Sequence, residues 1–119
     1  MPTEATSQKI HKLYTNELTM LLYNVTVGVD PSVEQEWLHW MKTEHILDVL
    51  NTKMFVSARI YKVLHEVEDG TVSYSTQYFA ESLDHVEKYL EHFAPALRQE
   101  VDKRFAGKYV AFRTLLEEA

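Results

Sequence analysis

Strict alternation of side chains begins at residue 20, in the stretch MLLYNVTVGV. Every second residue from Leu21 to Val29 is apolar, and the residues between them are more polar. A period of two is typical of a β-strand with one face on a hydrophobic core. Residues 1–19 are mostly polar and weakly periodic, so we expect a mobile arm there, followed by a single domain over residues 20–119. Met20 is itself a possible original start.

Helical periodicity replaces the alternation in residues 30–51. Asp30 is a suitable N-cap residue, and Pro31 suits the first helical position. Two apolar sets follow on roughly opposite helical faces: Val33, Trp37, Trp40 and Met41, then Ile46, Leu47, Val49 and Leu50. One straight helix cannot bury both sets, so we predict a break near Thr43 to His45 and a short helical segment from there to Leu50.

Two further strands are predicted at residues 55–65 and 71–80, where β-branched and aromatic residues alternate with polar ones. The segment 66–70 between them ends in Asp69-Gly70, which is a hairpin signal. The two strands are therefore expected to be antiparallel neighbours.

A second helix is expected after Ser82, which can act as its N-cap. Its apolar side chains form one stripe: Leu83, Val86, Leu90, Phe93, Ala94, Leu97 and Val101. Pro95 lies on the opposite side, where it either kinks the helix or marks a break after Phe93. Gly107 suits the position after the helix, and residues 108–116 predict the last strand.

The resulting order, β-α-β-β-α-β, predicts a ferredoxin-like α+β fold with two helices on one face of a four-stranded antiparallel sheet. The other face, here called the open face, mixes apolar and polar side chains. By alternation it carries Leu22, Asn24, Thr26, Phe55, Ser57, Arg59, Tyr61, Val63, Ser73, Ser75, Gln77 and Phe79, with either Tyr109, Ala111 and Arg113 or the alternate residues of the last strand. A mixed face of this kind suggests cover by a second copy of the chain.

The amino-acid composition argues against several classes of function. The chain of 119 residues has a net charge of −6, which argues against binding to nucleic-acid phosphates or anionic lipid. It contains no cysteine, so disulfides, thiolate zinc sites and thiol nucleophiles are excluded. With no long apolar run and no signal-peptide core, we expect a cytoplasmic protein without a membrane partner.

His45 is the best single candidate for catalysis. A histidine at a helix corner, with Glu44 and Asp48 within reach, could act as a general base oriented by a carboxylate. The alternative is a capping or surface histidine.

Ligand-binding candidates fall into two groups. Trp37 and Trp40 could line an aromatic pocket, although aromatic residues at helical spacing are more often core. The second group lies on the expected open face and could hold a carboxylate or phosphate: Asn24, Arg59, Tyr61, Gln77 and Arg113. Such arginines also pair commonly with acids of the same or a partner subunit.

No metal or organic cofactor is expected. His85 and His92 share a helix face but lie two turns apart, about 10 Å along the axis, which is too far to bind one metal. Glycine-rich phosphate loops and serine-hydrolase elbows are absent from the sequence. RNA-recognition domains share the strand order, but the basic and glycine positions of their RNP1 pattern are missing.

Four runs resemble the small bacterial proteins grouped as domain of unknown function 4286: LLYNVTV, EWLHWMKTEHILDVL, TQYFAESLDHVEKYLEHFAPALRQE and FAGKYVAFRTLLE. This resemblance extends from Met20 to Glu117 and implies a ferredoxin-like fold without an established activity.

The pattern W-x-x-W-M-x-x-E-H-I is similar, more distantly, to one in dimeric α/β-barrel proteins, which include cofactor-free monooxygenases and muconolactone isomerases. Many of these have a histidine followed two residues later by proline; here His45 matches and Leu47 replaces the proline. The resemblance implies two subunits that join their open sheet faces.

Three hypotheses follow from the sequence. The first is a homodimeric α/β barrel that binds a small apolar or carboxylated molecule. The second is a non-catalytic module for protein interaction or ligand sensing. The third is a cofactor-free monooxygenase-like or isomerase-like enzyme that uses His45 as base.

Overall fold

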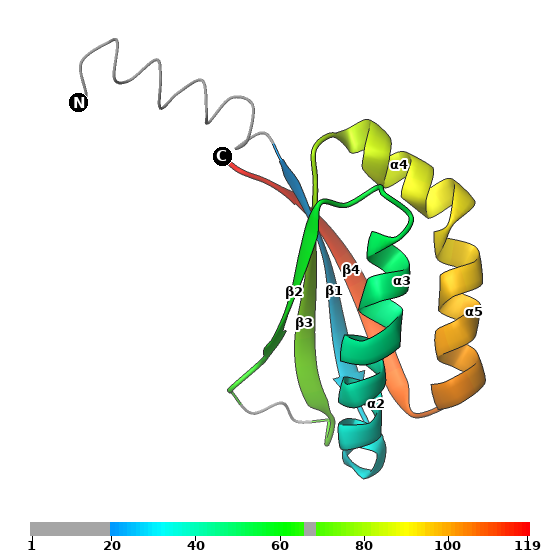
Figure 1. Ribbon diagram of the computed structural model, residues 1–119. Coiled ribbons are helices and arrows are strands. Elements are labelled where there is room, and N and C mark those ends of the chain that lie inside the picture. The colour runs from blue at the N-terminus through cyan, green and yellow to red at the C-terminus, as the bar shows by residue number, and fades with distance from the viewer. Residues whose placement is uncertain (1–19, 66–68) are drawn as a thin grey trace.

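The computed structural model describes residues 20–65 and 69–119 and has the predicted ferredoxin-like α+β fold (Figure 1). The predicted arm at residues 1–19 and part of the 66–70 hairpin lie outside the described residues. Four antiparallel strands form one sheet in the order β2-β3-β1-β4. Their bounds are β1 Leu21–Val29, β2 Ser57–Lys62, β3 Val72–Ala80 and β4 Tyr109–Glu117.

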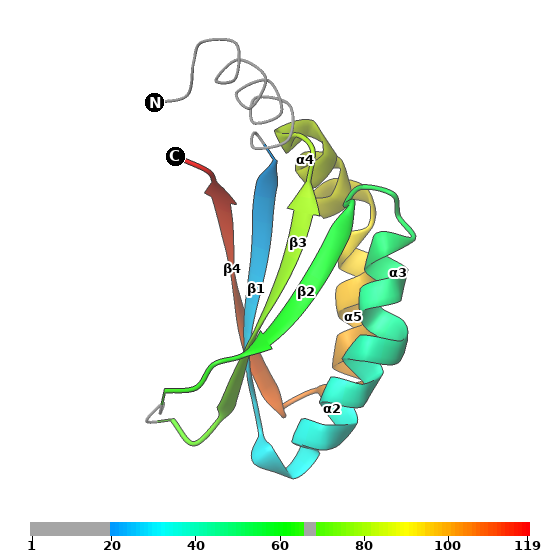
Figure 2. The ribbon, with the colours of Figure 1, turned by 60° about the vertical axis from the view of Figure 1, so that its left-hand side comes forward.

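The helices of the described residues all cover one face of this sheet, and none of them lies on the other face (Figures 1 and 2). The first helical stretch consists of η2 (Pro31–Val33), α2 (Glu34–Trp40), η3 (Met41–His45) and α3 (Ile46–Leu50). The second consists of α4 (Leu83–His92) and α5 (Ala94–Phe105). The core lies between these helices and the sheet.

The first helical stretch changes phase through a π-helical turn, η3. The backbone N–H of Ile46 bonds to the carbonyl of Met41, five residues earlier, so the turn accommodates one extra residue. This shift lets Trp37 and Val49 both face the core, although a straight helix would separate them. The predicted break is therefore present as a π turn that begins at Met41, while Leu47, expected inside, is 51 % exposed.

The second helical stretch breaks at Phe93, whose φ of −120° is not helical, and Pro95 occupies the first turn of α5. The break after Phe93 is confirmed. It also alters the predicted stripe, because Tyr89 is buried in place of Leu90. As predicted, the Ser82 side chain accepts a hydrogen bond from the His85 N–H, and Gly107 adopts a positive φ of 77° after α5.

Phe55 was expected on the open face and is instead buried in the core. The strand β2 starts only at Ser57, so Phe55 lies outside the strict alternation. Its ring packs edge-on against Tyr89, with the centroids 4.9 Å apart, and also contacts Tyr23 and Tyr78.

The pairing of β4 with β1 shows on which face of the sheet Arg113 lies. Arg113 is paired with Val25 across the sheet, and directly paired residues project to the same face. Val25 packs against the helix-side core, so Arg113 lies on the helix-covered face and not on the open face with Arg59. The open face instead receives the alternate residues of β4: Val110, Phe112, Thr114 and Leu116.

Candidate functional site

A cavity of about 50 Å³ lies between the sheet and the helices. Strands β1, β3 and β4 provide its floor, and α2, η3, α4 and α5 provide its walls. Much of the lining is apolar, including Val25, Val27, Trp37, Met41 and Leu97. The polar side chains that line it belong to two arginines, four tyrosines, one histidine and one threonine.

The charged groups of the cavity are all basic. Arg98 from α5 and Arg113 from β4 line it, and no aspartate, glutamate or lysine does. The Nη2 of Arg98 donates a hydrogen bond of 3.2 Å to the Tyr23 hydroxyl. Within residues 20–65 and 69–119, neither arginine forms an ion pair with a carboxylate. Two arginines without an ion-pair partner among the described residues thus border one cavity.

Four tyrosines also line the cavity: Tyr23, Tyr78, Tyr89 and Tyr109. Burial raises the pKa values of Tyr78 and Tyr89 well above the ordinary value for a phenol. Burial also raises the pKa of Tyr109 to about 12, assisted by its hydrogen bond to Asp102 and opposed by the nearby Arg113 and Arg98. The hydroxyl groups of Tyr78, Tyr89 and Tyr109 therefore stay protonated near pH 7, and the Tyr109 proton is donated to Asp102.

His45, at the end of the π turn, brings an uncharged ring to the same cavity. The ring stacks on Trp40, with centroids 5.0 Å apart and an interplanar angle of 29°. Burial lowers the pKa of His45 to about 4, although the charge of Asp48 opposes the shift. Its Nδ1 atom is buried and has no hydrogen-bond partner among the described residues. The neutral ring therefore keeps one nitrogen available to a ligand.

Thr76, in the middle of β3, is the one fully buried polar residue of the described core. Its Oγ1 atom also lacks a hydrogen-bond partner in the described part of the chain. Thr76 lines the cavity that holds His45. Buried polar groups without partners are uncommon in folded proteins, and here the two that occur among the described residues border the same cavity.

The sequence-predicted residues separate into two places. His45, Trp37 and Arg113 border the cavity, and Trp40 supports the His45 ring from behind. The remaining ligand candidates lie on the open face of the sheet: Asn24, Arg59, Tyr61 and Gln77. The expected convergence of Arg59 and Arg113 is therefore wrong, because the sheet lies between the two side chains.

The carboxylates proposed to orient His45 are both exposed. Glu44 lies 3.9 Å from Arg104, whose guanidinium group sits over the Trp40 ring. Asp48 makes no hydrogen bond to His45 in the described structure, and it affects the ring only through its charge. The orienting role of these two residues stays a prediction.

Sequence reasoning did not select Arg98, Thr76 or the four tyrosines. A signal existed for Arg98, because it precedes Val101 by three residues and follows Ala94 by four, next to the apolar stripe of the helix. For Thr76, alternation placed the side chain toward the helices, but nothing in the sequence shows that its hydroxyl lacks a partner.

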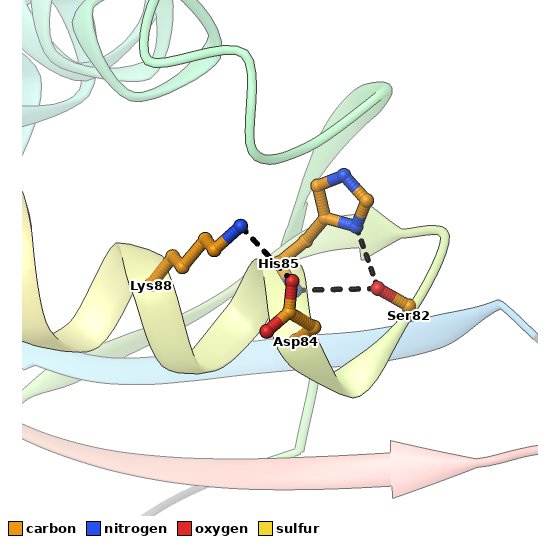
Figure 3. A network of polar contacts seen from close by, with 4 residues as sticks. All are labelled: Ser82, Asp84, His85 and Lys88. Atoms are coloured by element: carbon orange, nitrogen blue, oxygen red, sulfur yellow. Dashed lines mark hydrogen bonds and ion pairs between the residues drawn. The ribbon is translucent and has the colours of Figure 1, made fainter.

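A serine and a histidine also meet at the start of α4, where Ser82 Oγ lies 2.6 Å from His85 Nδ1 (Figure 3). The same Oγ accepts from the His85 backbone N–H at 3.3 Å, which is N-cap geometry. Asp84 pairs with Lys88 at 3.1 Å and not with the histidine. This group caps the start of α4. Among the described residues it lacks the third residue that would orient a catalytic histidine.

Neither a metal centre nor a membrane span is found in the described residues. No group of three or more His, Asp or Glu side chains in residues 20–65 and 69–119 is placed to hold a metal ion. No helix in that part of the chain is long and apolar enough to cross a membrane.

Solved structures share this fold at low sequence identity. An ethyl tert-butyl ether D (EthD) family protein from Bacillus halodurans superposes with a TM-score of 0.63 and 12% identity, covering 83% of this chain and 99% of that one. A conserved protein from Methanosarcina mazei gives 0.64 and 12%, with coverages of 90% and 100%. SnoaB, a cofactor-independent oxygenase from Streptomyces nogalater, gives 0.59 and 11%, with coverages of 84% and 93%.

Comparison with curated proteins and comparison with family models gave different results. No protein of curated function matches the chain. A family model does match, over residues 20–119, which include every strand and helix described above. The chain therefore belongs to the family described as domain of unknown function DUF4286.

Proposed function

We propose that this protein binds a small carboxylated molecule with a short apolar body in the cavity between sheet and helices. The observation that carries the proposal is the pair of arginines, Arg98 and Arg113, in a lining to which the described part of the chain contributes no carboxylate. A ligand carboxylate supplies the missing negative charge, and hydrogen bonds between guanidinium and carboxylate are among the stronger ones. The neutral hydroxyls of Tyr78 and Tyr89 add donors for the same anion.

The cavity limits the size of this molecule. Its volume of about 50 Å³ corresponds to room for about three or four water-sized groups. Its inner walls are apolar where Val25, Val27 and Met41 contribute. A short aliphatic chain therefore fits inside, with its carboxylate toward the arginines.

The open face supports the second part of the proposal, a homodimer. Large apolar side chains are exposed there on β4, with Phe112 at 63% and Val110 at 61%. Leu116 on the same strand and Tyr61 on β2 are also exposed. A patch of this kind is typical of an interaction surface, and a second copy of the chain presents a matching patch.

Catalysis by His45 is a second candidate, favoured by a buried Nδ1 without a partner among the described residues, on a ring that lines the cavity. With its proton on Nε2, the neutral ring can accept a proton at Nδ1 from a bound acid, without any cofactor. The similarity to SnoaB agrees with this candidate, but at 11% identity it concerns the fold alone. Deuterium exchange at the carbon between the ketone and the carboxylate of bound acetoacetate, faster than in buffer and lost in His45→Phe, would support it; exchange no faster than in buffer would leave a binding protein.

Titration with acetate, propionate, butyrate and valerate tests the binding proposal. Trp37 lines the cavity, so its fluorescence and its indole N–H resonance report on occupancy. We expect saturable binding by at least one acid, weakened by Arg98→Gln and by Arg113→Gln. Arg59→Gln is the matched control, because Arg59 lies on the open face. Equal loss in all three variants, or no saturable binding by any acid, would contradict the proposal.

A further inference from the structure

Two side-chain polar atoms on residues that line the cavity have no hydrogen-bond partner among the described residues. They are Thr76 Oγ1 and His45 Nδ1, both buried. The first belongs to a residue with no exposed surface at all, in the central part of β3. Leaving a buried polar atom unpaired costs free energy, so such atoms are normally satisfied by protein, water or ligand.

The neighbours of Thr76 explain why no protein group satisfies it. Across the sheet, Thr76 is paired with Val25 on β1 and with Ile60 on β2, and neither side chain can form a hydrogen bond. Thr76 and His45 both line the cavity, although the unpaired atom of each has almost no surface accessible to water, so a ligand group reaches these atoms only with a small shift of the lining side chains. A valine at position 76 would fill nearly the same space without the unpaired group, so the threonine hydroxyl has no packing function.

We infer that the ligand is a short hydroxycarboxylic acid whose carboxylate meets Arg98 and Arg113 and whose hydroxyl enters the inner end of the cavity. The inference rests on the proposed function and adds the second polar group of the ligand. A hydroxyl group both donates and accepts, so it can accept from Thr76 Oγ1 and donate to the neutral His45 Nδ1. A plain aliphatic acid would leave both of these atoms unpaired.

Matched pairs of acids that differ by one hydroxyl test this inference. The probes are 3-hydroxypropionate against propionate, 4-hydroxybutyrate against butyrate, and 5-hydroxyvalerate against valerate, so that the spacing between the two polar groups varies. We expect at least one hydroxy acid to bind about five- to tenfold more tightly than its partner, as for one net hydrogen bond. The readout is the dissociation constant from Trp37 fluorescence or resonance shifts.

Variants at position 76 separate ligand recognition from structure. Thr76→Val should reduce the preference for the hydroxy acid to about onefold, and the readout is the ratio of the two affinities in the same variant. Thr76→Ser keeps the hydroxyl and should keep the preference. His45→Phe retains an aromatic ring to stack on Trp40 and should also lower the preference.

The outcomes distinguish this inference from the function on which it rests. If plain and hydroxy acids bind equally in every pair, or if the preference survives in Thr76→Val, the inference is overturned while carboxylate binding stands. If no acid of either series binds in an arginine-dependent way, the proposed function itself fails.

Discussion

Neighbouring hydroxyl groups on the two faces of the sheet differ in their hydrogen bonding. On β3, Ser75 points to the open face and donates a 2.6 Å hydrogen bond to Asn24 Oδ1, and Gln77 Nε2 donates to Ser75 Oγ at 3.3 Å. Thr76, the next residue, points to the helix-covered face and has no partner among the described residues. The polar groups nearer to solvent are therefore paired, and the buried one is not.

The apolar side chains show the reverse contrast. On the open face, Phe112 and Val110 are exposed without cover, whereas the apolar residues under the helices are packed except around the cavity. Unpaired polar atoms mark a place for a small ligand, and exposed apolar groups mark a place for a protein surface. We therefore propose a different partner for each face.

The largest expected effect is on the open face. Replacing Phe112 with glutamate puts a charge into the proposed interface, which should weaken dimerisation by about 100-fold or more. Light scattering and sedimentation over a concentration series measure this. Leu47→Glu is the control, because Leu47 is also exposed, at 51%, but lies on the helical side in α3. A wild-type protein that is monomeric at tens of micromolar would remove the dimer from the account.

The next effect is the pH dependence of stability contributed by His45. Its pKa is about 4 in the folded protein, below the ordinary value of 6.5. Between pH 6.5 and 4 the unfolded chain takes up a proton that the folded chain does not, so stability is full above pH 6.5 and falls as the pH is lowered. The loss should amount to about 2–3 kcal/mol by pH 4, given 1.36 kcal/mol per pKa unit and incomplete burial.

Denaturant unfolding of wild type and His45→Phe at several pH values checks this expectation. The difference between the two curves isolates His45 from the carboxylates, Asp48 included, that titrate in the same range. His39→Gln is the control, because His39 is an exposed histidine of the same helical stretch. Parallel curves for wild type and His45→Phe would show that the ring is not held neutral by burial.

The arginine variants should have an intermediate effect on ligand affinity. Each of Arg98→Gln and Arg113→Gln removes a charged hydrogen bond worth about 1.5 kcal/mol or more, so the affinity for the best-bound acid should fall about tenfold or more. Arg59→Gln should change it less than twofold. Isothermal titration with the same acid provides the comparison. If only Arg59→Gln weakens binding, the ligand site belongs to the open face.

The smallest effects concern the two adjacent hydroxyls in the absence of ligand. Ser75→Ala should lower stability by about 1 kcal/mol, because it breaks the hydrogen-bonded row on the open face. Thr76→Val should raise stability by about 1 kcal/mol, because it removes an unpaired buried hydroxyl. Denaturant melts of the two variants test opposite signs at neighbouring positions. If both variants change the free energy of unfolding in the same direction, the contrast between the two faces is contradicted.

The fold was predictable because the local signals were strong and mutually consistent. Alternation in Leu21–Val29, the Asp30 cap and the Ser82 cap all correspond to observed element starts. The π turn was also indicated by the sequence, since Trp37 and Val49 project about 120° apart on an ideal helix yet are both apolar and buried. A conflict of phase within one helix indicates a place where the helix must change its winding.

The candidate site was only partly predictable, because it depends on the face of the sheet to which each strand residue projects. In β4, both alternating sets mix apolar and polar residues, so the pattern did not assign Arg113 to a face. Phe55 alternates correctly with its neighbours but precedes the hydrogen-bonded strand. The lack of a partner for Thr76 follows from its cross-strand neighbours Val25 and Ile60, which are known only from the register.

The most direct test of the account is a titration of isotope-labelled protein with butyrate and 4-hydroxybutyrate, followed through side-chain resonances. The account predicts saturable shifts of the Trp37 indole N–H and of the Arg98 and Arg113 Nε–H signals, with the Arg59 Nε–H signal unmoved. Shifts at Arg59 without shifts at Trp37, or no saturable shift at any of these groups, would contradict the claim that the helix-covered face holds the ligand.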